Sequence, residues 1–243
     1  MDSAVSELCR RLDSRIKTHV VFVNAAKVVQ YRDNFALRDV IERAGMLLAD
    51  GMPLVWLSRL KGTPLPERVA GVDLMDRMVK AAAERGYRVY FLGARHEVVS
   101  KAVADFVKRY PLLQVAGYRD GYFLPQQEKE INAEINCSKA DLVLIAMSTP
   151  QKELWADRNM EKLHAIIYQG VGGGFDVVAG LAKRAPLWMQ RTGLEWSYRL
   201  FQEPGRMWKR YLFSNLSFLR LALHDLATAS RNVQEPAAHA SSD

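Results

Sequence analysis

The amino-acid sequence predicts an α/β protein built on a mostly parallel, doubly wound sheet with helices on both faces. Short runs rich in β-branched and aromatic residues alternate with longer segments whose apolar residues recur at three- and four-residue intervals. The short runs are mostly unbroken apolar stretches, as in strands that helices cover on both faces. Strands that alternate with helices favour right-handed βαβ units and therefore a parallel sheet.

Five segments are predicted strands and four are predicted helices. Gly86 and Pro111 supply stop signals for the first two helices. The pattern is clearest between residues 73 and 175, whereas the first 70 residues are less regular. The predicted strands are 19–24, 87–93, 113–118, 140–147 and 164–172, and the predicted helices are 73–86, 97–111, 126–139 and 153–163.

The composition indicates a folded protein with no spanning helix and no secretory signal. A chain of 243 residues with 49% hydrophobic residues can bury a full core, as one large domain or two closely packed ones. It has no run of about 18 apolar residues, and its N-terminal segment lacks the apolar core of a signal peptide. Cys9 and Cys137 lack zinc-site spacing and the histidines are scattered, so we expect no metal, no disulfide and a cytoplasmic location.

Positive charge is concentrated near the C-terminus. The formal net charge of +7 implies an anionic partner such as nucleic acid, acidic lipid or a phosphorylated small molecule. Residues 188–220 contain six lysines and arginines against two glutamates, and so supply four of the seven net charges. Three of the five tryptophans lie in the same stretch, and Pro204-Gly205 is expected to divide it into two helices. A membrane-surface segment and a core-packed helix with a solvated basic face fit this pattern about equally well.

Small and polar residues follow four of the predicted strands. Ligands of open α/β sheets bind outside the carboxyl ends of the strands, so we expect these four loops to converge on one crevice. The loops are NAAK after Val23, GARHE after Leu92, STPQKE after Met147 and GVGGGFD after Tyr168.

The glycine-rich loop has two interpretations. Glycines at 170, 172, 173 and 174 let the backbone approach a ligand closely, and the segment 175–181 would offer N–H groups to an anion. The loop matches neither the dinucleotide fingerprint nor the Walker motif. A strand-to-helix turn with a close backbone crossing explains the glycines equally well.

Two further loops carry candidate functional side chains. Asp50 lies between apolar residues and a Gly-Met-Pro turn, where a carboxylate can act as a general base or simply accept from turn amides. The residues alone favour the turn. In the STPQKE loop the serine and threonine are candidate helix caps with Glu153 as capping-box partner, which leaves Gln151 and Lys152 to face a ligand.

Taken together, seven sequence blocks resemble the WecG/TagA/CpsF family of bacterial glycosyltransferases, glycosyltransferase family 26. They occur in the family's order and cover roughly residues 20 to 212. The blocks are VNAAKVV, LLADGMPLVW, RVAGVDLM, YFLGA, STPQKELW, GVGGGFDVVAGLAKRAPLWMQRTGLEWSYRL and QEPGRMWKRY. Against this resemblance, a basic nucleic-acid-binding module and an enzyme acting on a soluble phosphorylated substrate are the alternatives. The nucleic-acid-binding module gives no reason for the four strand-end loops.

The resemblance implies a Rossmann-like core that moves a sugar, with inversion, from a UDP-sugar to a polyprenyl-diphosphate-linked saccharide. No metal or cofactor, and no nucleic acid, is expected to take part, and a homo-oligomer is possible. The implied location is cytoplasmic, with the protein bound peripherally to the anionic inner face of the cytoplasmic membrane. The implied domains are a catalytic domain at 1–187, a C-terminal appendage at 188–230 and a disordered tail at 231–243.

The resemblance also assigns site residues, and it changes the interpretation of Asp50 from turn residue to base. One position departs from the family pattern, because the usual PKQE reads PQKE here and puts Lys152 where a glutamine is expected. The catalytic set is Asp50, Asn24 and Arg68. The donor-binding set is Gly93, Gln151, Lys152, Glu153, Gly172, Gly173, Gly174 and Asp176. The set that meets the acceptor diphosphate and the membrane is Arg199, Arg206, Lys209 and Arg210.

Overall fold

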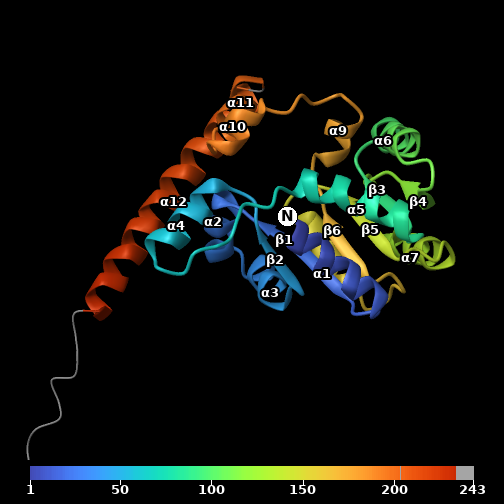
Figure 1. Ribbon diagram of the computed structural model, residues 1–243, viewed down its shortest axis with the longest axis horizontal. Coiled ribbons are helices and arrows are strands. Elements are labelled where there is room, and N and C mark those ends of the chain that lie inside the picture. Colours follow the sequence, from blue (N-terminus) through green and yellow to red (C-terminus); the bar gives the residue numbers. More distant parts are fainter. Residues whose placement is uncertain (203, 234–243) are drawn as a thin grey trace, which may run out of the picture.

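The computed structural model, which describes residues 1–202 and 204–233, contains one six-stranded sheet. All the strand pairs are parallel, and the order across the sheet is β2-β1-β6-β5-β3-β4 (Figure 1). The predicted doubly wound, Rossmann-like α/β fold is therefore confirmed. The strands are β1 Thr18–Val23, β2 Met46–Ala49, β3 Arg88–Gly93, β4 Gln114–Arg119, β5 Leu142–Ala146 and β6 Ile167–Gly170.

Helices cover both faces of this sheet. On one face lie α1 (Asp2–Asp13), α5 (Gly71–Arg85), α6 (His96–Arg109) and the short α9 (Gly174–Val178). On the other face lie α3 (Phe35–Arg43), α7 (Glu128–Cys137, after the 3₁₀ turn Pro125–Gln127) and α8 (Gln151–Asn159). All four helices predicted from periodicity are present.

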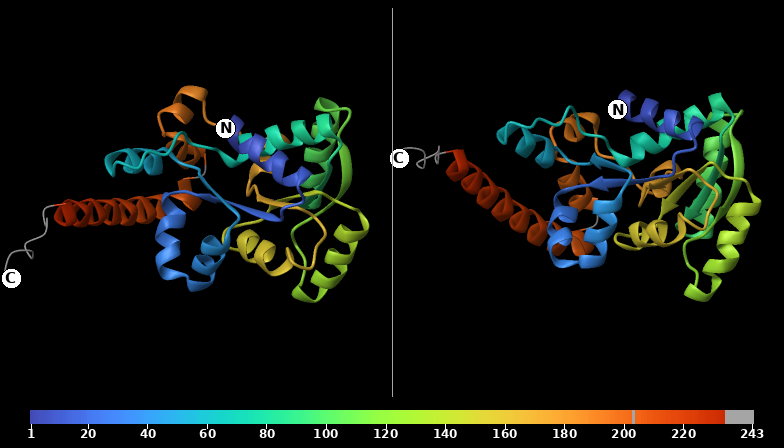
Figure 2. Two further views of the ribbon diagram at one scale, coloured as in Figure 1. Left: turned by 60° about the horizontal axis from the view of Figure 1, so that its bottom comes forward. Right: turned by 90° about the horizontal axis from the view of Figure 1, so that it is seen from below.

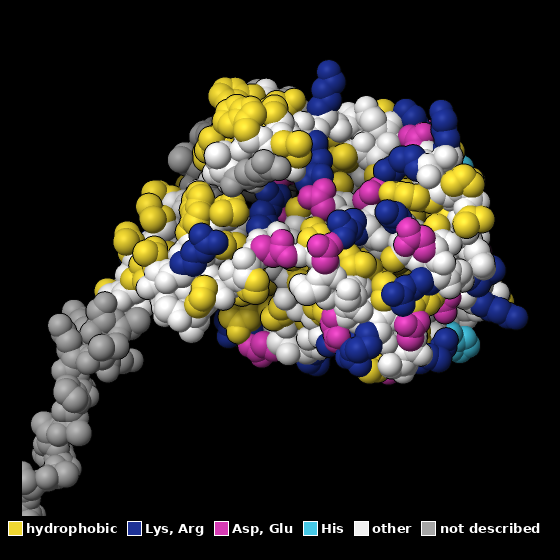
Figure 3. Space-filling view, in the orientation of Figure 1, with side chains coloured by type: hydrophobic (Ala, Val, Ile, Leu, Met, Phe, Trp, Pro, Cys, Tyr) yellow, Lys and Arg dark blue, Asp and Glu magenta, His cyan; other side chains and the backbone are white. Residues whose placement is uncertain are grey.

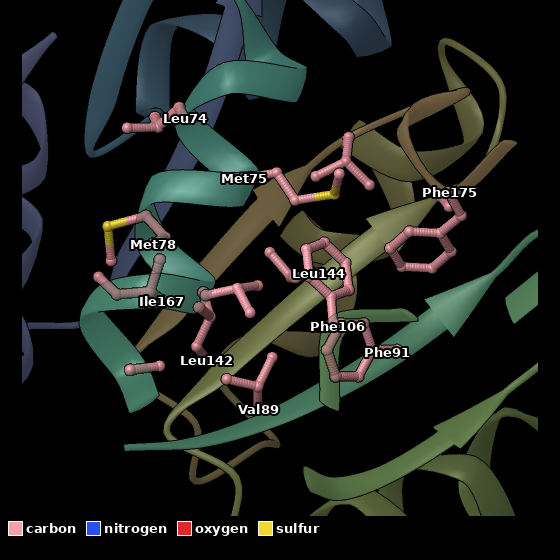
Figure 4. Close-up of a cluster of buried hydrophobic side chains, with 14 of the residues drawn as sticks. Leu74, Met75, Met78, Val89, Phe91, Phe106, Leu142, Leu144, Ile167 and Phe175 are labelled. Atoms are coloured by element: carbon pink, nitrogen blue, oxygen red, sulfur yellow. The ribbon is translucent and has the colours of Figure 1, made fainter. Parts of the chain in front are cut away.

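The main core forms where alternate strand residues meet α5 and α6. In strands, successive side chains point to opposite faces, so Val89 and Phe91 of β3 and Leu142 and Leu144 of β5 share one face. They pack against apolar side chains of the two helices (Figure 4). The phenyl ring of Phe91 also lies 5.8 Å from that of Phe175 in α9, which anchors the segment after the glycine loop.

The first 70 residues contain regular structure that the sequence pattern does not reveal. Asn24 and Asn34 cap α2 (Ala25–Asp33) and α3, and their side chains accept from Lys27 N at 3.0 Å and Leu37 N at 2.9 Å. The unpredicted strand β2 is a four-residue edge strand, and α4 (Met52–Leu60) begins directly after it.

Three helices follow the α/β body. They are α10 (Leu187–Arg191), α11 (Glu195–Gln202) and α12 (Pro204–Val233), so the predicted break falls at the start of the last helix. Helix α12 packs along α2 and then extends beyond the body (Figure 2). It ends three residues inside the stretch predicted as a tail, and residues 234–243 lie outside the described part. Among residues 1–202 and 204–233, none of the helices combines the length and the hydrophobicity of a membrane-spanning segment.

Candidate active site

The carboxyl ends of five neighbouring strands lead into Asp50, Asn24 and the predicted donor-binding residues. In sheet order, β2 leads into Asp50, β1 into Asn24, β6 into the glycine loop, β5 into the STPQKE loop, and β3 ends at Gly93. Adjacent strands lie about 4.8 Å apart, so this row extends over about 19 Å. The four predicted loops therefore share one edge of the sheet, and β2 adds a fifth.

Asn24 and Asp50 are neighbours at one end of this row. The amide of Asp50 donates to Val23 O at 2.8 Å, which continues the pairing of β1 with β2 beyond the strands. A Cβ on Gly51 would lie 3.8 Å from Cβ of Asn24. Because Asn24 also caps α2, its side chain is held in place beside the segment that carries Asp50.

Arg68 connects Asp50 to the C-terminal helices. The amide of Val69 donates to Ala49 O at 2.9 Å, which brings this segment alongside the end of β2. The Nε atom of Arg68 lies 3.6 Å from Asp50 Oδ1, and the same guanidinium lies 2.5 Å from Glu195 Oε2 and donates to Gln190 O at 2.9 Å. A guanidinium at this distance attracts the ionised carboxylate, which is the form that can accept a proton.

A buried charge cluster lies beneath the site, and its member Lys27 is not among the residues that the sequence predicts there. Lys27, Lys152 and Glu153 are only 4%, 8% and 2% exposed. Oε1 of Glu153 lies 2.6 Å from Lys27 Nζ and 2.9 Å from Lys152 Nζ, and Lys152 also donates to Thr149 Oγ1. Burial alone would raise the pKa of Glu153, but the two ammonium groups lower it below its usual value.

This cluster corrects the predicted capping box at the start of α8. The N-cap is Pro150, and no side chain caps the helix. Glu153 instead turns inward to Lys27, 126 residues away, and its burial suits support of the loop better than direct contact with a donor. A lysine in the first turn of a helix usually points into solvent. Lys27 is therefore recognised as part of the cluster only from its ion pair with Glu153, which the local sequence does not show.

The neighbouring pair Gln151 and Lys152 points in two directions. Gln151 is exposed and accepts a hydrogen bond from Ser148 Oγ at 2.7 Å. The stem of Lys152 crosses the end of β6, where a Cβ on Gly170 would lie 3.0 Å from Lys152 Cδ. The exchange of these residue types relative to the family pattern therefore puts the cation inside and the amide outside.

The glycines at the strand ends have structural reasons of their own. Gly172 has a φ of +52°, and a Cβ on Gly174 would lie 3.1 Å from Met75 Cε. Gly93 has a φ of +122°, and a Cβ there would lie 2.4 Å from Ala146 O. The glycine-rich loop therefore forms a strand-to-helix turn that packs against side chains, and the close backbone contact lies at Gly93 instead. Donor contacts by Gly93, Gly172, Gly173, Gly174 and the half-buried Asp176 stay predictions.

The C-terminal helices present apolar side chains to solvent. Trp188, Trp196, Phe213 and Leu216 are all exposed, and hydrophobic side chains gather over these helices in Figure 3. The backbone of Arg199 lies in α11, and that of Arg206, Lys209 and Arg210 in α12, but these four side chains lie outside the described part of the chain. Within the described residues, no group of three or more His, Cys, Asp or Glu side chains is arranged to hold a metal.

Comparison with known proteins identifies the family. The model of the glycosyl transferase WecG/TagA/CpsF family matches residues 1–232. The chain belongs to the WecG/TagA/CpsF family. The resemblance found in the seven sequence blocks is confirmed, and the protein is a glycosyltransferase.

Two curated members of the WecG/TagA/CpsF family are similar along most of the chain. A protein from Bacillus spizizenii strain W23 is 32% identical over 218 residues, which cover 90% of this chain and 84% of that relative. A protein from Bacillus subtilis strain 168 is 34% identical over 204 residues, which cover 83% and 77%. Both are named N-acetylglucosaminyldiphosphoundecaprenol N-acetyl-beta-D-mannosaminyltransferase.

Proposed function

We propose that this glycosyltransferase moves a sugar from a UDP-sugar to a saccharide linked through a diphosphate to a polyprenyl lipid. The names of the two relatives support such an acceptor. The main structural support for the proposal is the row of strand-end loops, which has Asp50 beside Arg68 at one end. This arrangement places a candidate base next to a row of loops along which the donor can bind.

The proposed reaction is one in-line displacement. The acceptor hydroxyl loses its proton to Asp50 as its oxygen bonds to the anomeric carbon, and the bond from that carbon to UDP breaks. UDP leaves with the bonding electron pair on its phosphate oxygen. Backbone N–H groups near residues 172–176 and the cation Arg68 stabilise the developing charge. The proposed reaction uses no metal ion, so chelation with EDTA should leave the rate of sugar transfer unchanged.

Replacing Asp50 by Asn tests the reaction. The amide cannot take a proton, so turnover should fall by about 10²–10⁴-fold. UDP binding, measured by isothermal titration calorimetry, should persist. Asp39→Asn, on the exposed surface of α3, is the matched control and should keep full activity. A folded Asp50→Asn protein with full activity would refute the role of Asp50.

We also propose that α10–α12 bind an anionic membrane surface. Exposed aromatic and aliphatic side chains lie on these helices together with six cationic residues between 188 and 220. Each cation near an anionic bilayer contributes about 1 kcal/mol, which predicts reversible, salt-sensitive association. Replacing Arg199 and Arg206 by Ala should reduce transfer to a lipid-linked acceptor more than UDP binding. Liposome co-sedimentation at low and high salt measures the association, and equal pelleting of a chain truncated after Leu187 would contradict it.

A further inference from the structure

A groove with a volume of about 770 Å³ lies between α2, α4 and α12, outside the strand-end row. Its apolar lining comes from all three helices. Val28 and Val29 belong to α2, Leu57 to α4, and Phe218, Leu221 and Ala222 to α12. Phe218 is almost completely buried at 8% exposure, whereas Val29 and Leu221 remain half-buried and line open space.

Two walls of the groove begin at the candidate catalytic residues. Helix α2 starts immediately after Asn24, and the amide of Val28 donates to Asn24 O at 3.0 Å. Helix α4 starts two residues after Asp50. Since a helix rises about 1.5 Å per residue, Val28 is only about 6 Å along α2 from Asn24. The groove therefore continues from the end of the site where the acceptor hydroxyl has to lie.

The far end of the groove is charged. Arg32 and Asp33 at the end of α2 line it together with His224 and Asp225 of α12, whereas Arg220 lies between Phe218 and Leu221 along α12. Asp225 is paired with Lys61, at a distance of 2.6 Å, which ties α12 to the end of α4. This end suits the charged headgroup layer of a membrane, whereas Val28, Val29, Leu57, Phe218, Leu221 and Ala222 form the apolar part of the groove.

Helix α12 has apolar side chains on the side opposite the groove as well. Leu216, Leu219 and Leu223 are exposed there. A helix that is apolar on two sides has a second nonpolar neighbour, and the proposed membrane association supplies it. A hydrocarbon chain that leaves the groove then enters the bilayer beside α12.

We propose that this groove binds the part of the acceptor's polyprenyl chain next to its diphosphate. The inference rests on the proposed function, because it assumes a lipid-linked acceptor. A polyprenyl chain has no hydrogen-bonding groups, so valine, leucine and phenylalanine side chains can bury it without leaving polar atoms unsatisfied. The volume is within the range of small-molecule sites.

Cysteine protection tests the groove directly and needs no turnover. Val29→Cys is introduced into a Cys137→Ser background, because Cys137 is exposed and Cys9 is buried. Geranylgeranyl diphosphate should slow maleimide labelling of Val29→Cys by at least about tenfold, and inorganic pyrophosphate should not. Leu219→Cys, on the opposite side of α12, is the control and should be labelled at the same rate with and without the lipid.

The other outcomes overturn the proposal. Equal labelling with and without geranylgeranyl diphosphate means that the groove does not bind the chain. Equal protection of Leu219→Cys means that detergent or lipid coats α12 without selecting the groove. Slow labelling in the absence of lipid that accelerates on dilution means that a second copy of the chain covers it. Because no sugar is transferred, failure here is distinguishable from failure of the Asp50→Asn test.

A kinetic variant gives a second measurement. Leu221→Trp narrows the groove and should raise KM at least about tenfold for an acceptor with a long polyprenyl chain. It should leave KM unchanged for an acceptor whose diphosphate bears only a short alkyl group. Leu219→Trp is the matched control, and circular dichroism checks that both variants fold. Equal effects of Leu221→Trp on both acceptors would contradict the proposal.

Discussion

Removing the carboxylate of Glu153 should strongly destabilise the protein. Lys27 and Lys152 both contact the same oxygen, Oε1, so Glu153→Gln leaves two buried ammonium groups close together without an anion between them. At 2.6 Å and an effective dielectric constant of about 20, the attraction of one lysine to Glu153 is about 6 kcal/mol before desolvation is counted. Breaking a buried ion pair by removing one partner typically costs about 3–5 kcal/mol.

We therefore expect Glu153→Gln to lower the free energy of unfolding by about 3–5 kcal/mol, a large part of the usual total of about 5–15 kcal/mol. Lys27→Met should cost less, because Glu153 keeps Lys152 as its partner at 2.9 Å. Urea denaturation followed by tryptophan fluorescence measures both losses. Glu84→Gln removes an exposed pair with Lys80 and is the control, with an expected loss below about 1 kcal/mol.

Two results would refute this reasoning. One is a loss below about 1 kcal/mol for Glu153→Gln with an unchanged urea dependence, which would mean that the cluster is hydrated or its charges are compensated elsewhere. The other is a larger loss for Lys27→Met than for Glu153→Gln. That order contradicts the expectation that losing the shared carboxylate, which leaves both lysines buried, costs more than losing one of its two partners.

The remaining predictions concern a buried histidine and a constrained glycine. Burial lowers the pKa of His19 to about 4, whereas an unfolded histidine titrates near 6.5. The folded state therefore favours the neutral form of His19. The free energy of unfolding keeps this contribution in full above pH 6.5 and loses about 3 kcal/mol of it in total as the pH falls from 6.5 to 4. His19→Gln should flatten the urea-unfolding free energy over that window, and an unchanged slope would contradict the prediction. Gly93→Ala should cost about 2–5 kcal/mol in thermal unfolding because of its φ of +122° and the 2.4 Å approach to Ala146 O. Gly205→Ala, with no atom within 4 Å of the new Cβ, should leave stability unchanged or improve it.

The sequence pattern predicts the buried strands well and the exposed edge poorly. All five residues of β5 are buried, so its unbroken apolar run is easy to recognise. Strand β2 has only four residues, and Leu47 within it is 51% exposed, so neither length nor alternation marks it as a strand. It pairs on one side only, with β1, and its place in the sheet depends on that long-range contact.

The sequence predicts single residues of the site but not the contacts between distant segments that assemble it. Asp50 before a glycine fits an ordinary turn, and the family resemblance rather than local chemistry selects it. Its contact with Arg68 links two segments that are not adjacent in sequence. The pairing of Lys27 with Glu153 crosses 126 residues, and no local pattern reports a partner at that separation.

The pairing of Arg68 with Glu195 has a consequence for chimaeric enzymes. Arg68 belongs to the segment between α4 and α5, and Glu195 is the first residue of α11, yet the two form an ion pair next to Asp50. A C-terminal segment transplanted from another family member brings its own side chain at position 195 into contact with Arg68. In a chimaera that joins the C-terminal helices of one enzyme to the sheet of another, the residues at positions 68 and 195 should therefore come from the same parent.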